Sequence, residues 1–272
     1  AQPTGKKARV QSKRTWKAAK SSSAPNTKAK QAIERIPMWQ FQDFAAPTPG
    51  SACDQTAGQC FTAHWNADGH DWVCHTAGGT KGISFGDPDG SLHVNLLPVG
   101  DDTLPVATEQ SVRGDVWNVT LPQADSQYSL RLALRVVEAT ETRLVIEPTL
   151  SIQTLLLDTH PTLDLTALGD CGVIFDQSDT LGDGSPPIST VQLHGETGSI
   201  AVLLAPTDAP FTTDLRREGH LQLRLFGEFL EKGVIRKARP WIVLDRSEQG
   251  VSEADLQAYL KRLCETPLPL TA

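Results

Sequence analysis

The sequence predicts a mainly β protein, an antiparallel β-sandwich-like domain with one C-terminal α-helix and a disordered basic N-terminal arm. Apolar and polar side chains alternate over long stretches, and turn residues separate many short apolar segments. No helical pattern lies between these segments, which excludes a βαβ rhythm. A chain of 272 residues could hold two domains, but all-β units of this size often form one. We therefore expect a single domain over residues 51–272.

Residues 1–36 form the predicted arm. The first 35 residues hold ten basic residues and one acidic residue, a formal charge of +9, whereas the other 237 hold 15 basic and 31 acidic residues, a charge of -16. The arm contains too few apolar side chains to offset the entropy lost on folding. The arm residues expected to contact a partner are Lys6, Lys7, Arg9, Lys13, Arg14, Lys17 and Lys20.

Several roles for this arm remain open at the level of sequence. It could lie on the acidic body of its own or a neighbouring subunit, bind another acidic protein, be the remnant of a targeting segment, or serve only as a solubilising tail. A basic arm also attracts nucleic acid or an anionic membrane surface, but the body's charge of -16 would repel a duplex everywhere else. We expect a protein partner or a second copy of the chain.

Residues 37–50 are predicted to be an aromatic strap and a connector. Three aromatic residues and a methionine alternate roughly with polar residues between positions 36 and 44. Large apolar side chains that follow a disordered arm usually mark the beginning of a core, so we expect a first strand or a strap pinned to the domain. A short docking motif is the alternative. Pro47 and Pro49 indicate the connector.

The clearest alternation runs from Tyr128 to Val136, where apolar side chains occupy every second position and Arg131 and Arg135 lie between them. A second alternating segment runs from Leu144 to Leu156. Two such segments joined by a short polar loop predict an antiparallel hairpin. Pro148 removes a backbone donor, so we expect the second strand to lie at an edge or to bulge there.

Further short strands are expected where apolar segments recur between turns. They are Ser91–Leu97, Asp115–Leu121, Gly172–Phe175, Thr190–His194, Ser199–Leu204, Leu221–Phe226, Gly233–Ala238 and Trp241–Leu244. Many short antiparallel strands of this kind are typical of sandwiches and related folds.

One helix is predicted, over residues 252–265. Ser252 is a suitable N-cap, and Asp255 follows three positions later, close to a capping box. Four apolar residues at i, i+3, i+4 and i+7 then form one stripe, from Leu256 to Leu263. Pro267 prevents the helix from continuing. We expect the stripe to pack on a sheet or to cover a sheet edge.

Half of the 12 cysteines and histidines of the chain lie within 23 residues. This cluster consists of Cys53, Cys60, His64, His70, Cys74 and His75, with Asp54, Asp68 and Asp71 as additional oxygen ligands. Thiolates and imidazoles together suit tetrahedral Zn²⁺, so a zinc site is one prediction, and the glycines here favour a loop. No Cys-x-x-Cys pair and no His-Glu-x-x-His motif is present. A Cys53–Cys60 disulfide, a catalytic cluster and no special site are the alternatives.

Two other motif matches fail on context. The segment Gly82–Gly86 fits the Gly-x-Ser-x-Gly pattern of serine hydrolases, in which a strand precedes the serine and a helix follows it. Here a glycine-rich loop is expected before the segment and the turn Asp87–Gly90 after it, so the pattern does not predict a nucleophile. Asp87–Gly90 resembles a Ca²⁺ loop, yet its glycine comes too early and no closing glutamate follows, which favours a β-turn.

The sequence favours a non-catalytic β-sandwich module that binds a partner or assembles, with the basic arm on an acidic partner or a neighbouring subunit. The alternative is a metal-assisted or His/Asp-dependent enzyme that acts on a carbohydrate or another polar metabolite. Its candidate residues are His64, His70 and His75 with Asp68 and Asp71. No apolar segment reaches 18 residues, so we expect no membrane-spanning helix and a soluble protein, with a cytoplasmic location favoured over export.

Overall fold

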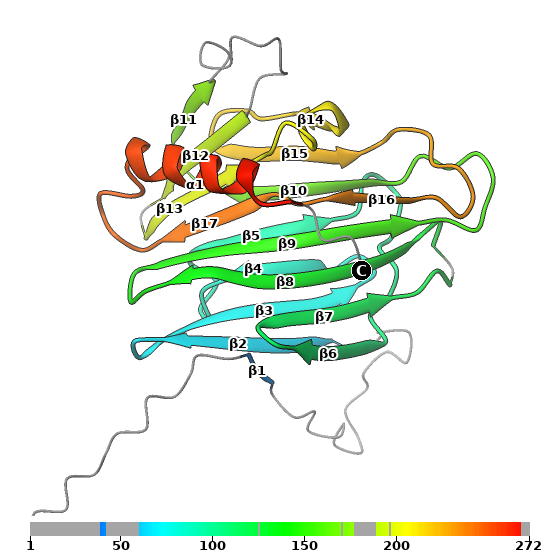
Figure 1. Ribbon diagram of the computed structural model, residues 1–272, viewed down its shortest axis with the longest axis horizontal. Coiled ribbons are helices and arrows are strands. Elements are labelled where there is room, and N and C mark those ends of the chain that lie inside the picture. The colour runs from blue at the N-terminus through cyan, green and yellow to red at the C-terminus, as the bar shows by residue number, and fades with distance from the viewer. Residues whose placement is uncertain are drawn as a thin grey trace, which may run out of the picture. The chain divides into compact units, whose positions relative to one another are not determined.

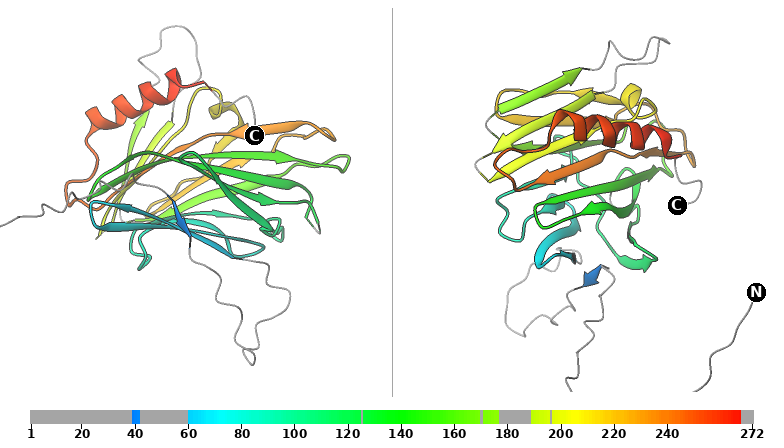
Figure 2. Two further views of the ribbon diagram at one scale, coloured as in Figure 1. Left: turned by 60° about the horizontal axis from the view of Figure 1, so that its bottom comes forward. Right: turned by 60° about the vertical axis from the view of Figure 1, so that its left-hand side comes forward.

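The protein is a β-sandwich of two antiparallel sheets with one helix on the outer face of one of them (Figures 1 and 2). This confirms the predicted fold class. The computed structural model describes residues 39–41, 60–124, 126–169, 171–176, 189–195 and 197–267. The predicted arm, with all seven of its partner-contacting lysines and arginines, and most of the strap and connector lie outside the described residues.

The first sheet, called sheet I, has eight strands, all paired antiparallel. In spatial order they are β1 (Gln40–Phe41), β2 (Phe61–Ala67), β3 (His70–Gly78), β4 (Gly82–Gly86), β5 (His93–Leu97), β10 (Thr162–Leu168), β15 (His220–Phe226) and β14 (Thr212–Asp214). A short 3-10 turn, η1 (Ala209–Phe211), precedes β14.

The second sheet, called sheet II, has nine strands and lies in front of sheet I in Figure 1. Its spatial order is β11 (Cys171–Asp176), β12 (Ser189–Gly195), β13 (Gly198–Leu203), β17 (Trp241–Asp245), β9 (Arg143–Gln153), β8 (Ser129–Ala139), β7 (Val116–Leu121) and β6 (Glu109–Arg113), with β16 (Ile235–Ala238) also paired to β9. All eight further strands predicted from the alternation and turns are present, with ends shifted by a few residues.

The main core lies between the sheets, where inward side chains from both form one cluster. Ile83, Val94 and Leu165 of sheet I and Leu130 and Ile152 of sheet II are fully buried in it. These positions alternate with outward ones along each strand, as a layer with one buried face requires. The outer faces of the two sheets are therefore the surfaces left for a helix or a ligand.

The described part of the predicted strap is pinned to the domain. Trp39 is buried, its ring centroid is 5.1 Å from that of Trp65 in β2 and 5.8 Å from that of Trp117 in β7, and its Nε1 donates to the Asp115 carbonyl. Strand β1 then pairs with β2. Trp39 thus joins the two sheets at this end of the sandwich, as expected for the first core residue of the domain.

Strands β8 and β9 form the predicted hairpin, but the expectation for Pro148 is wrong. Strand β9 is internal, with β8 on one side and β16 and β17 on the other. Ile242 pairs with Ile146 and Ala238 pairs with Leu150 in one common register, so Pro240 falls opposite Pro148. Neither proline has an N–H to donate, so the pairing of β9 with β16 and β17 is interrupted at this point. The strand tolerates Pro148 through this gap and does not lie at an edge.

The predicted helix is α1 (Glu253–Glu265), and the Ser252 hydroxyl caps it by accepting from the Asp255 N–H. Its stripe of Leu256, Tyr259, Leu260 and Leu263 packs on the outer face of β13, β17 and β9 and forms a second apolar cluster with them. The Arg143 guanidinium of β9 donates to both Asp245 and Asp255, which ties the first turn of the helix to the sheet. Helix α1 therefore covers only one part of this outer face (Figure 1).

In the described ranges, no helix has the length and apolar character needed to cross a membrane.

Candidate ligand-binding groove

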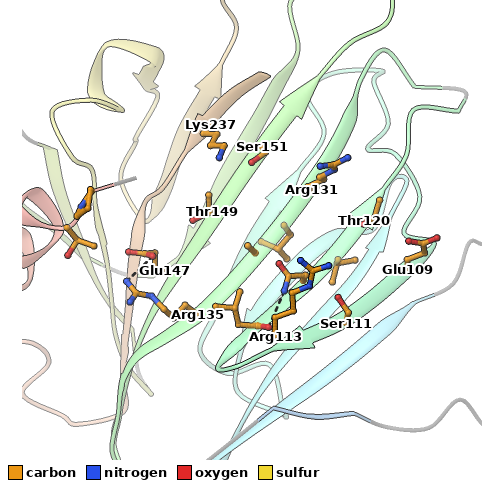
Figure 3. A pocket seen from close by; sticks show the side chains of 17 residues that line it. Glu109, Ser111, Arg113, Thr120, Arg131, Arg135, Glu147, Thr149, Ser151 and Lys237 are labelled. Carbon is orange, nitrogen blue, oxygen red and sulfur yellow. Dashed lines mark hydrogen bonds and ion pairs between the residues drawn. The ribbon is translucent and has the colours of Figure 1, made fainter. Parts of the chain in front are cut away.

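The part of the outer face of sheet II that α1 leaves open is hollowed into a groove of about 740 Å³. Its walls and floor come from β6, β7, β8, β9 and β16 and from the residues just after α1 (Figure 3). The lining residues are Glu109, Ser111, Arg113, Val116, Asn118, Val119, Thr120, Arg131, Leu132, Ala133, Arg135, Glu147, Thr149, Ser151, Lys237, Thr266 and Pro267. This set is called the groove below.

The strand register arranges the groove in three rows that cross the strands, because residues directly opposite each other share one face of a sheet. The first row is Glu109, Thr120, Arg131, Ser151 and Lys237; the second is Ser111, Asn118, Ala133 and Thr149; the third is Arg113, Val116, Arg135 and Glu147. Ten of these thirteen outward side chains are labelled in Figure 3. Polar positions that are far apart in the sequence thus meet on one surface.

The groove deepens from β6 toward β9. Its residues on β6 are exposed, whereas Glu147, Thr149 and Ser151 on β9 are only 5–6% exposed. No described residue forms a hydrogen bond with the hydroxyl of Thr149 or Ser151. Two hydroxyls at the deep side of a hollow can therefore donate to or accept from a ligand.

The wall beside β9 is held by Arg239, a buried residue between β16 and β17. Its guanidinium donates to the carbonyl oxygens of Leu263, Thr266 and Pro267 at distances of 2.6–3.2 Å. A cation at the end of a helix satisfies carbonyls that have no partner inside the helix. This contact fixes the chain after α1 in place, and Thr266 and Pro267 then form the rim of the groove.

Glu147 is the buried carboxylate of the groove, and protein donors occupy both of its oxygens. Its Oε1 accepts from Arg135 at 3.0 Å, and its Oε2 accepts from the Trp241 indole N–H at 2.7 Å. Arg239 lies 3.7 Å from the same Oε2. The charge of Glu147 is thus compensated by two arginines, as a buried carboxylate requires.

The predicted zinc cluster lies elsewhere, on the β2–β3 hairpin of sheet I, where the glycines had favoured a loop. That loop prediction is wrong for the described residues: Asp68 and Gly69, with φ of 51° and 88°, form a two-residue turn between two regular strands. Both residues have positive φ, which is the geometry of the type I′ turn that joins hairpins.

The hairpin places the cluster's side chains on two opposite faces. Cys74 is buried in the main core, opposite Ala63, whereas His64 and His75 belong to the outer face of sheet I. Cys60 and His70 are exposed at the two ends of the hairpin. Within the described residues, no three His, Cys, Asp or Glu side chains come together as a group that could hold a metal. Cys53 lies outside the described residues, so a zinc site and a Cys53–Cys60 disulfide both stay predictions.

The two outer-face histidines are diagonal neighbours. His75 Nδ1 lies 2.9 Å from the Thr62 hydroxyl, while the buried Nε2 of His64 has no described hydrogen-bond partner. Partial burial and the His64 ring lower the pKa of His75 below its usual 6.5. On the other face, burial raises the pKa of the Cys74 thiol well above its usual 9.0, which disfavours the thiolate that binds metals.

No protein-family model matches the chain, and no curated protein matches it. The function therefore has to be inferred from the groove itself.

Proposed function

We propose that the chain is a non-catalytic β-sandwich binding module and that an extended polar ligand lies in the groove of sheet II. The observation that carries this proposal is the buried polar floor on β9, where the hydroxyls of Thr149 and Ser151 face a hollow and the Glu147 carboxylate is fixed beside them by Arg135 and Trp241. Binding sites commonly combine a preformed hollow with a few fixed polar groups that orient the ligand.

The dimensions of the groove favour an oligomer over a small metabolite. From β6 to β16 the groove spans four strand spacings, about 19 Å, and its three rows span four residues, about 13 Å along a strand. Its volume of about 740 Å³ would also suit a drug-sized molecule, so the length of the groove is what favours the longer ligand. A chain of several sugar units or a similar linear molecule would fill such a surface.

The chemistry of the lining supports binding rather than catalysis. Its described side chains are those of Ser, Thr, Asn, Arg, Lys, Glu and apolar residues. Hydroxyls such as those of Thr149 and Ser151 need an adjacent base to act as nucleophiles. The one buried carboxylate, Glu147, is engaged by Arg135 and Trp241 through both oxygens. Amides, hydroxyls and guanidinium groups are, in contrast, well suited to hold a hydroxyl-rich ligand in place.

The test is to fill the groove. Ala133 lies in the middle of the second row, between Asn118 and Thr149, and Ala133→Trp would occupy the centre of the hollow. Titration calorimetry with cellohexaose, xylohexaose, hexagalacturonate and its methyl ester would measure binding. We expect at least one hexasaccharide to bind the unchanged protein and Ala133→Trp to weaken it about tenfold or more, because a tryptophan side chain excludes the ligand from the floor.

The matched control is Ser84→Trp, which places the same side chain on the outer face of sheet I, at a half-buried position between His75 and Asn95. This variant should bind as the unchanged protein does. Failure of these four hexasaccharides and of a heparin-derived hexasaccharide to bind would contradict the proposal, and so would equal binding by the Ala133→Trp variant.

The arm keeps the role predicted for it, contact with an acidic partner or with the acidic body of a neighbouring subunit. Its charge of +9 against -16 for the rest of the chain supports this, because opposite charges speed and orient association. The arm and the groove are independent parts of the proposal.

A further inference from the structure

The groove has the opposite charge to the body that surrounds it. Beyond residue 35 the chain holds 31 acidic and 15 basic residues. The groove contains four of those basic residues, Arg113, Arg131, Arg135 and Lys237, but only two of the acidic ones, Glu109 and Glu147. A formal charge of +2 thus gathers on one face of a body that carries -16. A local positive charge on an acidic protein attracts negatively charged ligands to that site.

Two of these cations are not used by the fold. Arg113 and Arg131 are exposed, and neither guanidinium has a hydrogen-bond or ion-pair partner among the described residues. Arg135, in contrast, is paired with Glu147. Arg113 and Arg131 are therefore the groups that can receive an anion, and the only acidic residue of the groove without a described cation beside it is Glu109, at the edge on β6.

The spacing of the cations favours a ligand with several anionic groups. Arg131 and Lys237 share a row two strands apart, about 10 Å between Cα atoms, and Arg113 is two strands and four residues from Arg131, about 16 Å. Side chains stand roughly perpendicular to a sheet, so the charges keep much of this separation. A ligand with negative groups repeated along its length matches this arrangement better than a single phosphate or carboxylate.

The rest of the lining decides the class of polyanion. The described lining holds no aromatic side chain on which a nucleic-acid base could stack. An acidic peptide would bring backbone groups that need partners, but the groove lies on a sheet face, where the backbone is already paired. Side chains such as Asn118, Thr149 and Ser151 instead offer the donors and acceptors that sugar hydroxyls use.

We infer that the ligand of the groove is a linear polysaccharide that carries negative groups, carboxylates or sulfates. This inference rests on the proposed binding function and names its ligand. Arg113 and Arg131 form charge-assisted hydrogen bonds with the anionic groups, which are shorter and stronger than neutral ones. The hydroxyls of Thr149 and Ser151 bind the sugar hydroxyls at the deep side of the groove.

The experiment compares ligands that differ in charge. Titration calorimetry at low salt would use hexagalacturonate, the same hexamer as its methyl ester, and a heparin-derived hexasaccharide. We expect an acidic hexamer to bind at least about tenfold more tightly than the neutral ester, because a hydrogen bond to a charged group is worth more than a neutral one. Tighter binding of the heparin fragment would assign sulfate, and tighter binding of hexagalacturonate would assign carboxylate.

Single substitutions test whether the acidic hexamer binds in the groove. Arg131→Gln and Arg113→Gln should each weaken binding of the preferred acidic hexamer about tenfold, and raised salt should weaken binding by the unchanged protein. The matched control is Arg217→Gln, because Arg217 is also exposed but lies in the turn between β14 and β15 of sheet I. This variant should bind normally.

The outcomes separate the inference from the proposed function. If the neutral ester binds as tightly as the acidic hexamers and Ala133→Trp abolishes this binding, the binding function stands and the charge inference is overturned. If no hexasaccharide binds, both are overturned. Tighter binding of oligothymidylate or polyglutamate than of any acidic hexasaccharide, weakened by Arg113→Gln and Arg131→Gln, would overturn the inference in favour of a nucleic-acid or protein partner of the groove.

Discussion

The two halves of the outer face of sheet II are both buried on β9 but differ in chemistry. Val145, under α1, is 0% exposed and belongs to the apolar cluster of the helix. Glu147, Thr149 and Ser151, the next outward residues of the same strand, are 5–6% exposed and face the groove. The change from apolar to polar occurs within one strand, at the end of the helix.

This difference shows which half of the face serves stability and which half serves another purpose. Burying polar groups costs free energy unless they are hydrogen-bonded, and apolar residues of similar size would stabilise the same positions better. The hydroxyls of Thr149 and Ser151, which have no partner among the described residues, are therefore not explained by folding, whereas Glu147 is held by Arg135 and Trp241. Sites where local chemistry departs from what stability favours are commonly functional sites.

The largest change in stability is expected in the half of the outer face that α1 covers. Leu263 is fully buried between α1 and the sheet, and Leu263→Ala should lower the free energy of unfolding by about 3–4 kcal/mol, because a cavity remains where the side chain was. Urea denaturation of the whole chain would measure it. The control is Arg131→Ala in the open half, which should change stability by less than about 0.5 kcal/mol. Similar losses for both variants would remove the distinction between the halves.

A smaller change in stability is expected at Glu147, where the helix-covered half meets the groove. Glu147→Gln replaces one accepting oxygen with an NH₂ group, which then faces a donor from Arg135 or Trp241. It also leaves buried Arg239 without its nearest carboxylate. We expect a loss of about 2 kcal/mol in the free energy of unfolding. Unchanged stability would mean that the contacts of Glu147 with Arg135, Trp241 and Arg239 do not stabilise the fold.

Sequence alone predicted the elements whose local signals agree with their tertiary role. The alternation of β8 and β9 and the cap and apolar stripe of α1 predicted the positions of these elements correctly. The alternation also placed Arg131 and Arg135 on the face of β8 opposite the core. The β2–β3 hairpin was missed because its glycines and its Cys and His residues were taken as a loop. The signal was present in Asp68-Gly69, the dipeptide that favours type I′ turns.

The groove itself could not be predicted in the same way. Each of its polar residues, taken alone, is an ordinary outward position of a strand. Only the register of five strands brings Glu109 and Lys237, which are 128 positions apart, into one row. The position of the rim depends on Arg239 and its contacts with the end of α1, which no local pattern indicates. Pairing between distant strands is information that alternation does not carry.

The smallest effect is expected at the shallow edge of the open half, where Glu109 faces the same groove as the two unpaired arginines. Glu109→Gln removes a negative charge near a bound anion, so affinity for the preferred acidic hexasaccharide should rise about two- to threefold at low salt. Affinity for the neutral methyl ester should not change, and neither should the free energy of unfolding, because Glu109 is exposed. The increase should vanish at high salt, where exposed charges are screened. An equal increase for the neutral ester would show that the residue acts through shape, and the electrostatic distinction between this half and the helix-covered half would then be lost.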